Sequence, residues 1–432
     1  MSPECPSDLG DVKSRSLAEC GMARGMNASN TALRVRLGDT HLATDSQDCS
    51  AILREIVTLV LTHGGQIHPG ACWHERGGQL TVTCDASMGV GEHPLVVVPR
   101  ELLVPVSGAE WADSQERLML LSPPPGLTPV QKTLLDLHIQ LYNATGKIPW
   151  IVTHHPRALL VRQQELLDAL QVIRPDFYAE AVTPAHIFLD TRVFGLKPDQ
   201  PLAPDDAHPP MGTAAAFAHP AAGSSGSVRK THVLMPLIDI LNHHPQGAPY
   251  RLDALSLQVQ ISQPRRDQEC FAAYGGRRDV LDLALHYGYL DEATPFAFSA
   301  PVEVEVEGLC RIRVAAGRVR PAYPLDPPRT QWDGETLELS HLCAHSGHPE
   351  RLQTVLRLPL LAIANKRRYP PKVSGRLIEE GLERLCQANV NALGQVERAA
   401  QGCSNEPAAG LLIDAVQRQA TILRRVLHPN SQ

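Results

Sequence analysis

Two short blocks in the middle of the chain carry residue types that suit chemistry at a buried site. The first is an apolar run that ends abruptly in Asn242 and His243, whose side chains donate and accept hydrogen bonds. The second has Tyr-Gly pairs at Tyr274 and Tyr287, on either side of an apolar segment. A tyrosine ring can wall a narrow channel while its hydroxyl forms hydrogen bonds beside a reacting group. The sequence therefore indicates a short buried element that presents Asn242 and His243 at its tip.

Each of these residues also has a simpler structural explanation when it is taken alone. An Asn-His pair after an apolar run is typical of a turn or a cap. A tyrosine is more often a core residue with a satisfied hydroxyl. Gly275 and Gly276 after Tyr274 permit the close approach of a ligand, and they fit a turn equally well. The order and separation of the two blocks favour function over these explanations.

The two blocks together resemble the SET-domain methyltransferases, and more narrowly the branch typified by the Rubisco large-subunit lysine methyltransferase. In that branch a Pro-x-x-Asp-x-x-Asn-His block precedes a Tyr-Gly…Leu…Tyr-Gly-Phe block. The residues at matching places in this chain are Pro236, Asp239, Asn242, His243, Tyr274 and Tyr287. Weaker likenesses at 90–99, 191–194 and 368–370 extend the resemblance over about residues 50–427.

The resemblance implies a fold, an activity and the roles of individual residues. The fold is α+β, with a SET β-core of small antiparallel sheets, a helical insertion and an all-helical C-terminal domain that binds the substrate. The activity is S-adenosylmethionine-dependent N-methylation of a protein, on lysine or, as the alternative, on histidine, with no metal required. The implied catalytic residue is Tyr274, and the residues implied to bind the donor or shape the channel are Asn242, His243, Arg192, Asp239 and Tyr287.

The chain departs from the family's pattern at three places. Residues 79–81 (Gln-Leu-Thr) stand where two glycines of the donor-binding loop are expected. Residues 279–280 (Asp-Val) replace the usual Ser-Asn, and residues 244–245 (His-Pro) follow the Asn-His pair where the family often has Ser. These departures leave open a protein of another class, a SET-fold interaction protein without catalysis.

Hydrophobic periodicity predicts where helices and strands lie along the chain. Helices are expected over 51–63, from 129, over 159–173 and through nearly every segment beyond 335. Strands are expected at 80–84, 95–98, 255–261, 302–306 and 310–314. The expected domains are a disordered leader at 1–48, a SET domain at 49–325 with a helical insertion at about 125–190 and a flexible loop at 195–230, and a helical substrate-binding domain at 335–432 that resembles the one in Rubisco methyltransferase.

The charge of the chain limits its partners. A formal net charge of −6 and a pI near 6.3 give no overall attraction to nucleic acid or to an anionic membrane. From Arg351 to the end, twelve Lys and Arg stand against six Asp and Glu. This excess is typical of solvated helical faces, and it also suits an acidic partner. The resemblance implies a protein substrate, and the charge gives no reason to expect nucleic acid or a membrane as partner.

The cysteines and the hydropathy of the chain indicate an intracellular protein. Ten cysteines are scattered without a Cys-x-x-Cys pair, which fits reduced thiols in the cytoplasm or another compartment such as the nucleus or an organelle. There is no secretory pattern and no apolar run long enough to span a bilayer. The histidine pairs at 154–155 and 243–244, with Cys72 and His74, lack the ligand spacing of a zinc site. The substrate protein, the degree of methylation and the oligomeric state stay open.

Overall fold

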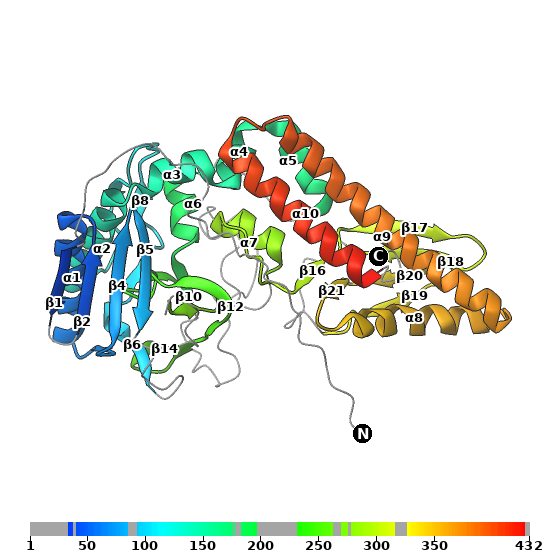
Figure 1. The fold of residues 1–432 in the computed structure, drawn as a ribbon, viewed down its shortest axis with the longest axis horizontal. Coiled ribbons are helices and arrows are strands. Elements are labelled where there is room, and N and C mark those ends of the chain that lie inside the picture. The colour runs from blue at the N-terminus through cyan, green and yellow to red at the C-terminus, as the bar shows by residue number, and fades with distance from the viewer. Residues whose placement is uncertain are drawn as a thin grey trace, which may run out of the picture.

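The computed structural model describes residues 33–37, 40–84, 93–175, 177, 183–196, 231–261, 269–274, 278–315 and 326–427. Its elements gather into two groups with a short helix between them (Figure 1). One group holds most of the sheets and the N-terminal helices, and the other holds the long C-terminal helices and a sheet of their own. The combination of helices with several small sheets, most of them antiparallel, confirms the predicted α+β class. No helix in the described ranges is long and apolar enough to cross a membrane.

The first sheet carries the turn that faces the candidate site. Its strands, in spatial order, are β1 (Leu33–Leu37), β2 (Thr40–Thr44), β4 (Ala71–Arg76) and β5 (Gln79–Cys84), and helix α1 (Gln47–Thr62) packs beside them. Leu80, Val82 and Cys84 are buried while the residues between them are more exposed, as the period of two predicts. The β4–β5 turn passes through Gly77 and Gly78, both with positive φ, a conformation that glycine adopts readily.

Four further small sheets complete the first group. Their strands are β13 (Tyr250–Leu252), β14 (Ser256–Gln260), β6 (Pro94–Pro99) and β3 (Gln66–Ile67) in one sheet, β10 (Val193–Leu196), β11 (Thr231–Leu234) and β7 (Val104–Pro105) in another, and the pairs β12 (Asn242–Ala248) with β15 (Phe271–Ala272) and β8 (Glu110–Trp111) with β9 (Leu120–Ser122). Most neighbouring strands are antiparallel, but β2–β4 and β12–β15 are parallel. The parallel β12–β15 pair brings together the two sequence blocks that the resemblance rests on.

The predicted helical insertion contains five helices among its described residues. They are α2 (Pro129–Ala144), α3 (Lys147–His154), α4 (Pro156–Arg162), α5 (Gln164–Ile173) and α6 (Pro184–Asp190). Helix α2 begins with a capping box, in which Thr128 and Gln131 satisfy each other's backbone groups. The single helix expected over 159–173 is wrong, because Gln163 has non-helical backbone angles (φ −125°, ψ 87°) and separates α4 from α5.

The second group contains strands as well as helices. Its elements are α7 (Val280–Tyr287), β16 (Phe296–Phe298) paired with β21 (Cys343–His345), the sheet of β17 (Val302–Val306), β18 (Cys310–Val314), β20 (Thr336–Leu339) and β19 (Thr330–Trp332), and helices α8 (Pro349–Lys366), α9 (Pro371–Gln401) and α10 (Pro407–Leu427). Helix α9 packs on this sheet at Gly381, where an added Cβ would lie 3.1 Å from Val306 Cγ2. Strands β20 and β21 correct the expectation of helix throughout 335–432, because Leu337 and Leu339 alternate into the core beside β18.

Two hydrophobic cores divide the chain differently from the predicted boundaries. Helices α2, α3 and α6 bury their apolar faces in the first core, but α4 and α5 bury theirs in the second, with the C-terminal helices. Helix α7 belongs to both, because Leu283 and Tyr287 lie in the first core while Leu281 and Leu285 lie in the second. The helix that carries one of the motif tyrosines is therefore fixed from both sides, as its central place in Figure 1 shows.

Two other expected boundaries also need correction. The disordered leader predicted at 1–48 contains β1 and β2, and α1 begins at Gln47. The alternation of Leu and Val with Arg over 33–37 is the strand signal that was missed. Of the flexible loop predicted at 195–230, residues 195–196 belong to β10, and the rest lies outside the described residues.

Candidate active site

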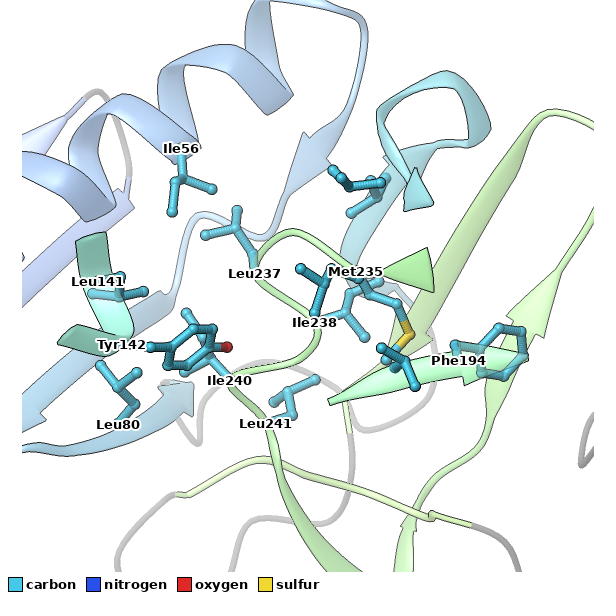
Figure 2. Packing of buried hydrophobic residues seen from close by; sticks show 14 of the residues in the cluster. Ile56, Leu80, Leu141, Tyr142, Phe194, Met235, Leu237, Ile238, Ile240 and Leu241 are labelled. Carbon is cyan, nitrogen blue, oxygen red and sulfur yellow. The ribbon is translucent and has the colours of Figure 1, made fainter. Parts of the chain in front are cut away.

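A buried double turn precedes the polar residues of the first block. Within residues 235–241, the Asp239 amide donates to the Met235 carbonyl at 2.9 Å. Leu237 has a positive φ of 64°, a conformation that costs energy for a non-glycine residue and persists only where packing imposes it. Figure 2 shows the apolar side chains of this turn packed among Ile56 of α1, Leu80 of β5 and residues of α2. The turn is therefore held from several sides, and the residues that follow it have a fixed position.

Asn242 joins three segments of the chain. Its side-chain amide donates to Glu269 Oε1 at 2.8 Å and to the Leu80 carbonyl of β5 at 3.4 Å. Its backbone is in register with Phe271 in the parallel β12–β15 pair. Asn242 thus lies where the end of the buried turn meets the edge of the first sheet.

Tyr274 closes the second block onto the first. Its hydroxyl donates a short hydrogen bond to the Leu241 carbonyl, and its amide donates to His243 Nδ1 at 2.8 Å. Burial raises the pKa of the Tyr274 hydroxyl well above its ordinary value. The hydroxyl is therefore a neutral hydrogen-bond donor at physiological pH, and it is not a base.

His243 is neutral in this arrangement. Because Nδ1 accepts the Tyr274 amide hydrogen, the proton of the neutral ring lies on Nε2. Burial lowers the pKa of His243 to about 4. The His243 ring lies 5.1 Å from the Tyr274 ring, measured between centroids. His243 therefore positions Tyr274 without adding charge to the site.

Three further tyrosines form an aromatic cluster with Tyr274. The Tyr287 ring is 5.0 Å and the Tyr250 ring 6.5 Å from the Tyr274 ring, and Tyr289 is 6.3 Å from Tyr287. Burial raises the pKa values of Tyr250, Tyr287 and Tyr289, so these hydroxyls also stay protonated. The buried Tyr289 hydroxyl has no hydrogen-bond partner among the described residues. The cluster offers an apolar wall with neutral polar groups set into it.

Tyr250 and Tyr289 were not predicted from the sequence. Tyr289 follows Gly288 at the place where the family's pattern has Phe, so the motif itself contained a signal for it. Tyr250 lies in β13, between the two blocks, and nothing in its local sequence distinguishes it from a core tyrosine. Both are brought to Tyr274 by tertiary packing.

Asp239 anchors the buried turn to helix α2. Its Oδ2 accepts a hydrogen bond from the Tyr142 hydroxyl at 2.5 Å and lies 3.5 Å from His138 Nε2. Burial opposes the charge on His138, but the Asp239 carboxylate outweighs it, so the pKa of His138 is raised. Asp239 Oδ1 is buried without a partner among the described residues. The carboxylate therefore faces α2, and the main-chain side of Asp239 faces the site.

Arg192 forms a hydrogen bond to the main chain of Asp239. One guanidinium nitrogen donates to the Asp239 carbonyl at 2.6 Å, and the group lies over the Tyr142 ring, 5.7 Å from its centroid. Arg192 Nε is buried and has no hydrogen-bond partner among the described residues. Arg192 thus has unused donor capacity next to the segment that ends in Asn242.

Lys147 is a second cation in this region, it is buried, and sequence reasoning missed it. It is 8% exposed, and its Nζ donates to Gln79 Oε1 at 3.2 Å. Burial and the nearby Arg192 lower the pKa of Lys147 to about 7, although Glu75 opposes this change. A lysine at the start of the otherwise apolar segment 147–152 was the available signal.

The β4–β5 turn explains the departure at residues 79–81. Gly78 has a φ of 79°, and an added Cβ there would lie 2.5 Å from the Thr145 carbonyl oxygen. Glu75 Oε1 accepts the Gly78 amide hydrogen at 2.8 Å. The glycine of this turn is thus required by the neighbouring backbone, and Gln79 after it holds Lys147.

Asp279, another departure from the family's pattern, fixes helix α7. It caps the helix by accepting the Asp282 amide hydrogen at 2.9 Å. The same carboxylate accepts from Arg174 at 2.8 Å, from Gln419 of α10 at 2.6 Å and from the Phe298 amide at 2.9 Å. This network ties α7, which ends at Tyr287, to the C-terminal helices.

The six residues expected at the site therefore form one connected set. Tyr274 contacts His243 and Tyr287, Asn242 follows the Leu241 carbonyl that Tyr274 binds, and Arg192 binds the Asp239 carbonyl. The set combines neutral hydroxyls, backbone carbonyls, aromatic walls and one cation, Arg192. Such an arrangement suits the alignment of a neutral nucleophile away from water. In the described ranges, no group of three or more His, Cys, Asp or Glu is placed to hold a metal ion.

Of the comparisons with known proteins, only the comparison with solved structures found a match. No protein-family model and no curated protein matches the chain. Among solved structures, the chain is similar to Rubisco LSMT bound to AdoMet, with 12% sequence identity, coverage of 87% of this chain and 90% of that chain, and a TM-score of 0.38. That protein typifies the branch named from the sequence. At this TM-score the likeness carries no argument about function, which has to come from the residues of the chain itself.

Proposed function

We propose that this protein is an S-adenosylmethionine-dependent protein N-methyltransferase that acts on lysine. One observation carries the proposal. The Tyr274 hydroxyl and the Leu241 carbonyl lie together next to Asn242, inside a cluster of neutral aromatic side chains. The motif order in the sequence supports the same conclusion independently.

The described residues fit the donor. S-adenosylmethionine, when bound, supplies an electrophilic methyl group on a sulfonium. Asn242, the backbone at His243 and Arg192 would hold it, and Arg192 Nε and the Tyr289 hydroxyl are buried polar atoms with no protein partner among the described residues. Buried polar atoms without partners are rare in folded proteins and indicate a place that a ligand or water completes.

The tyrosine cluster would prepare the acceptor. A lysine amine, with a pKa of about 10.4 in water, must lose its proton before it can attack a methyl group. A channel walled by Tyr274, Tyr287, Tyr250 and Tyr289 disfavours the charged ammonium, because it removes water without supplying an anion. The tyrosines have raised pKa values and cannot take this proton themselves, so it leaves to solvent before the amine is enclosed.

The C-terminal helices would present the protein substrate. Helix α8 exposes Leu358 and Leu361, which are 60% and 40% accessible, and the region from Arg351 carries the excess of positive charge. Apolar side chains next to basic ones suit docking of a protein surface. An intracellular location is part of this proposal, since it rests on the scattered cysteines of the sequence.

A non-catalytic SET-fold interaction protein is the second candidate. The observation that favours it is the β4–β5 turn, where Gly78 is packed against the Thr145 carbonyl and no glycine pair remains at 79–81. A protein of this kind would keep the aromatic cluster as core and bind the donor weakly. Donor affinity separates the two candidates.

The test is transfer of label from radiolabelled S-adenosylmethionine to proteins in lysate from the source of the protein. Tyr274→Phe is the matched variant, since it keeps the ring and removes only the hydroxyl. We expect a labelled band with the unaltered protein and a loss of transfer on the order of a hundredfold or more in the variant, with donor affinity within a few-fold. Mass spectrometry of the band distinguishes a lysine from a histidine acceptor.

Two outcomes would contradict the proposal. Near-normal transfer by Tyr274→Phe would move the catalytic position elsewhere. The absence of any labelled band, together with no heat of binding for S-adenosylmethionine in calorimetry, would favour the non-catalytic candidate.

A further inference from the structure

Lys147, which is buried, and Arg192, which is partly exposed but has a buried Nε, are two cations that lie close enough to affect each other. Lys147 starts helix α3, and Arg192 precedes strand β10. The charge of Arg192 contributes to the lowered pKa of Lys147, second only to burial. A buried cation with a second cation close to it is unfavourable unless an anion compensates the two charges.

The carboxylates near this pair are engaged elsewhere. Glu75 accepts the Gly78 amide hydrogen on one oxygen and the Ser46 amide hydrogen on the other, at 2.8 and 3.2 Å. The Asp239 carboxylate faces Tyr142 and His138. Within the described part of the chain, neither Lys147 nor Arg192 forms an ion pair with a carboxylate.

The hydrogen bonds of both cations leave capacity for a further ligand. The side chain of Lys147 makes its hydrogen bond to the neutral amide oxygen of Gln79, and that of Arg192 makes its own to the Asp239 carbonyl. Arg192 Nε is buried without a partner among the described residues, and an ammonium has three donors. A carboxylate suits this pair, because Arg binds it in a fixed planar geometry and Lys adds a second charge.

Each of the two cations binds a segment of the chain that reaches Asn242. Gln79, which holds Lys147, precedes Leu80, and the Leu80 carbonyl accepts from the Asn242 side chain. Arg192 binds the carbonyl of Asp239, three residues before Asn242. An anion bound between them would therefore lie on the Asn242 side of the site, and the tyrosine cluster would stay free for the reacting groups.

We infer that Lys147 is a donor-binding residue that, together with Arg192, binds the carboxylate of the methionine part of S-adenosylmethionine. The inference rests on the proposed function and adds a residue that the family's motifs do not contain. Gln79, which stands where a glycine was expected, orients Lys147 for this role. The departure at residues 79–81 then belongs to a working donor site.

The experiment compares two ligands that differ only in this carboxylate. S-adenosylmethionine and decarboxylated S-adenosylmethionine are titrated by calorimetry into the full chain, Lys147→Met, Lys147→Arg and the surface control Lys132→Met. We expect Lys147→Met to weaken S-adenosylmethionine about tenfold and the decarboxylated ligand less than about twofold, with Lys147→Arg restoring most of the loss. Lys132→Met should bind both ligands as the unaltered protein does.

Each other outcome has a defined meaning. Equal weakening of both ligands in Lys147→Met, or no weakening of either, overturns the inference and leaves the proposed function standing. If the unaltered protein binds neither ligand, the proposed function fails and the inference fails with it. If the protein binds inorganic sulfate but binds neither adenosyl ligand, the two cations form an anion site that serves another ligand, and the inference is overturned.

A stability measurement checks that the variant is folded. A lysine whose pKa is lowered on folding destabilises the protein below that pKa, and the penalty fades as pH rises from about 7 toward 10.5. Lys147→Met without ligand should therefore unfold at the same or a higher temperature than the unaltered protein at pH 6.5, by an amount that shrinks at pH 9. The variant should lose most of the thermal stabilisation by S-adenosylmethionine.

Discussion

Two buried aspartates, Asp239 and Asp279, anchor the two blocks of the candidate site in contrasting ways. Asp279 receives a guanidinium, an amide side chain and backbone amides, so its charge is well compensated. Asp239 receives one tyrosine hydroxyl and a longer contact with His138, and its Oδ1 is buried without a partner among the described residues. Both residues are almost fully buried.

The difference separates a structural anchor from one that is close to function. A buried carboxylate with a full set of donors is rigid and insensitive to small changes. One that depends on a tyrosine and a titratable histidine responds to pH and to the loss of a single hydroxyl. Asp279 joins the two cores through α7, whereas Asp239 lies in the buried turn that ends at Asn242. The more weakly satisfied of the two is thus the one that belongs to the motif.

The largest effect is expected for Asp279→Ala. The change leaves Arg174 as a buried charge without its main partner and removes the cap of α7, so the free energy of unfolding should fall by about 3–5 kcal/mol. Urea denaturation followed by circular dichroism measures this. Asp136→Ala, on the exposed face of α2, is the control and should change stability by less than about 0.5 kcal/mol. A loss below about 1 kcal/mol for Asp279→Ala would remove the contrast between the two aspartates.

A smaller effect is expected for Tyr142→Phe. It removes the hydroxyl that binds Asp239 Oδ2 and leaves a buried carboxylate with His138 alone, at a cost of about 1–3 kcal/mol. Tyr369→Phe is the matched control, because its hydroxyl also makes one hydrogen bond, to the Gly308 carbonyl at 2.7 Å near the surface. Urea denaturation of the two variants side by side should show the larger loss for Tyr142. Equal losses would mean that the Asp239 carboxylate does not depend on this bond.

Much of the local structure was predictable because it depends on neighbouring residues. The alternation of Leu80, Val82 and Cys84 gave β5, and the spacing of leucines gave α2 and α9. The pattern shows that one face of an element is buried, but it does not show against which partner. For that reason α4 and α5 were expected in the first domain although they pack in the second core.

The site was predictable only where its residues belong to short sequence motifs. Asn242, Tyr274 and Tyr287 lie in two recognisable blocks, and the structure brings these blocks together through the β12–β15 pair. Lys147 and Tyr250 reach the site from segments with no motif, and their contribution depends on burial and on neighbours that are distant in sequence.

The smallest effect, and the sharpest in sign, is the pH dependence of the Asp239–His138 pair. The folded pKa of His138 is raised, so the pair stabilises the protein fully below the ordinary histidine pKa of about 6.5 and loses this contribution as pH rises through the folded value. The stability difference between the unaltered protein and His138→Leu should therefore be larger at pH 5.5 than at pH 8.5. His155→Leu is the comparison of opposite sign, because burial lowers the pKa of His155 to about 3 and protonation of the unfolded chain at pH 5.5 then disfavours folding, so the stability of the unaltered protein relative to this variant should be lower at pH 5.5 than at pH 8.5. A His138 difference that is constant or grows with pH would show that the histidine is neutral, and that Asp239 relies on Tyr142 alone.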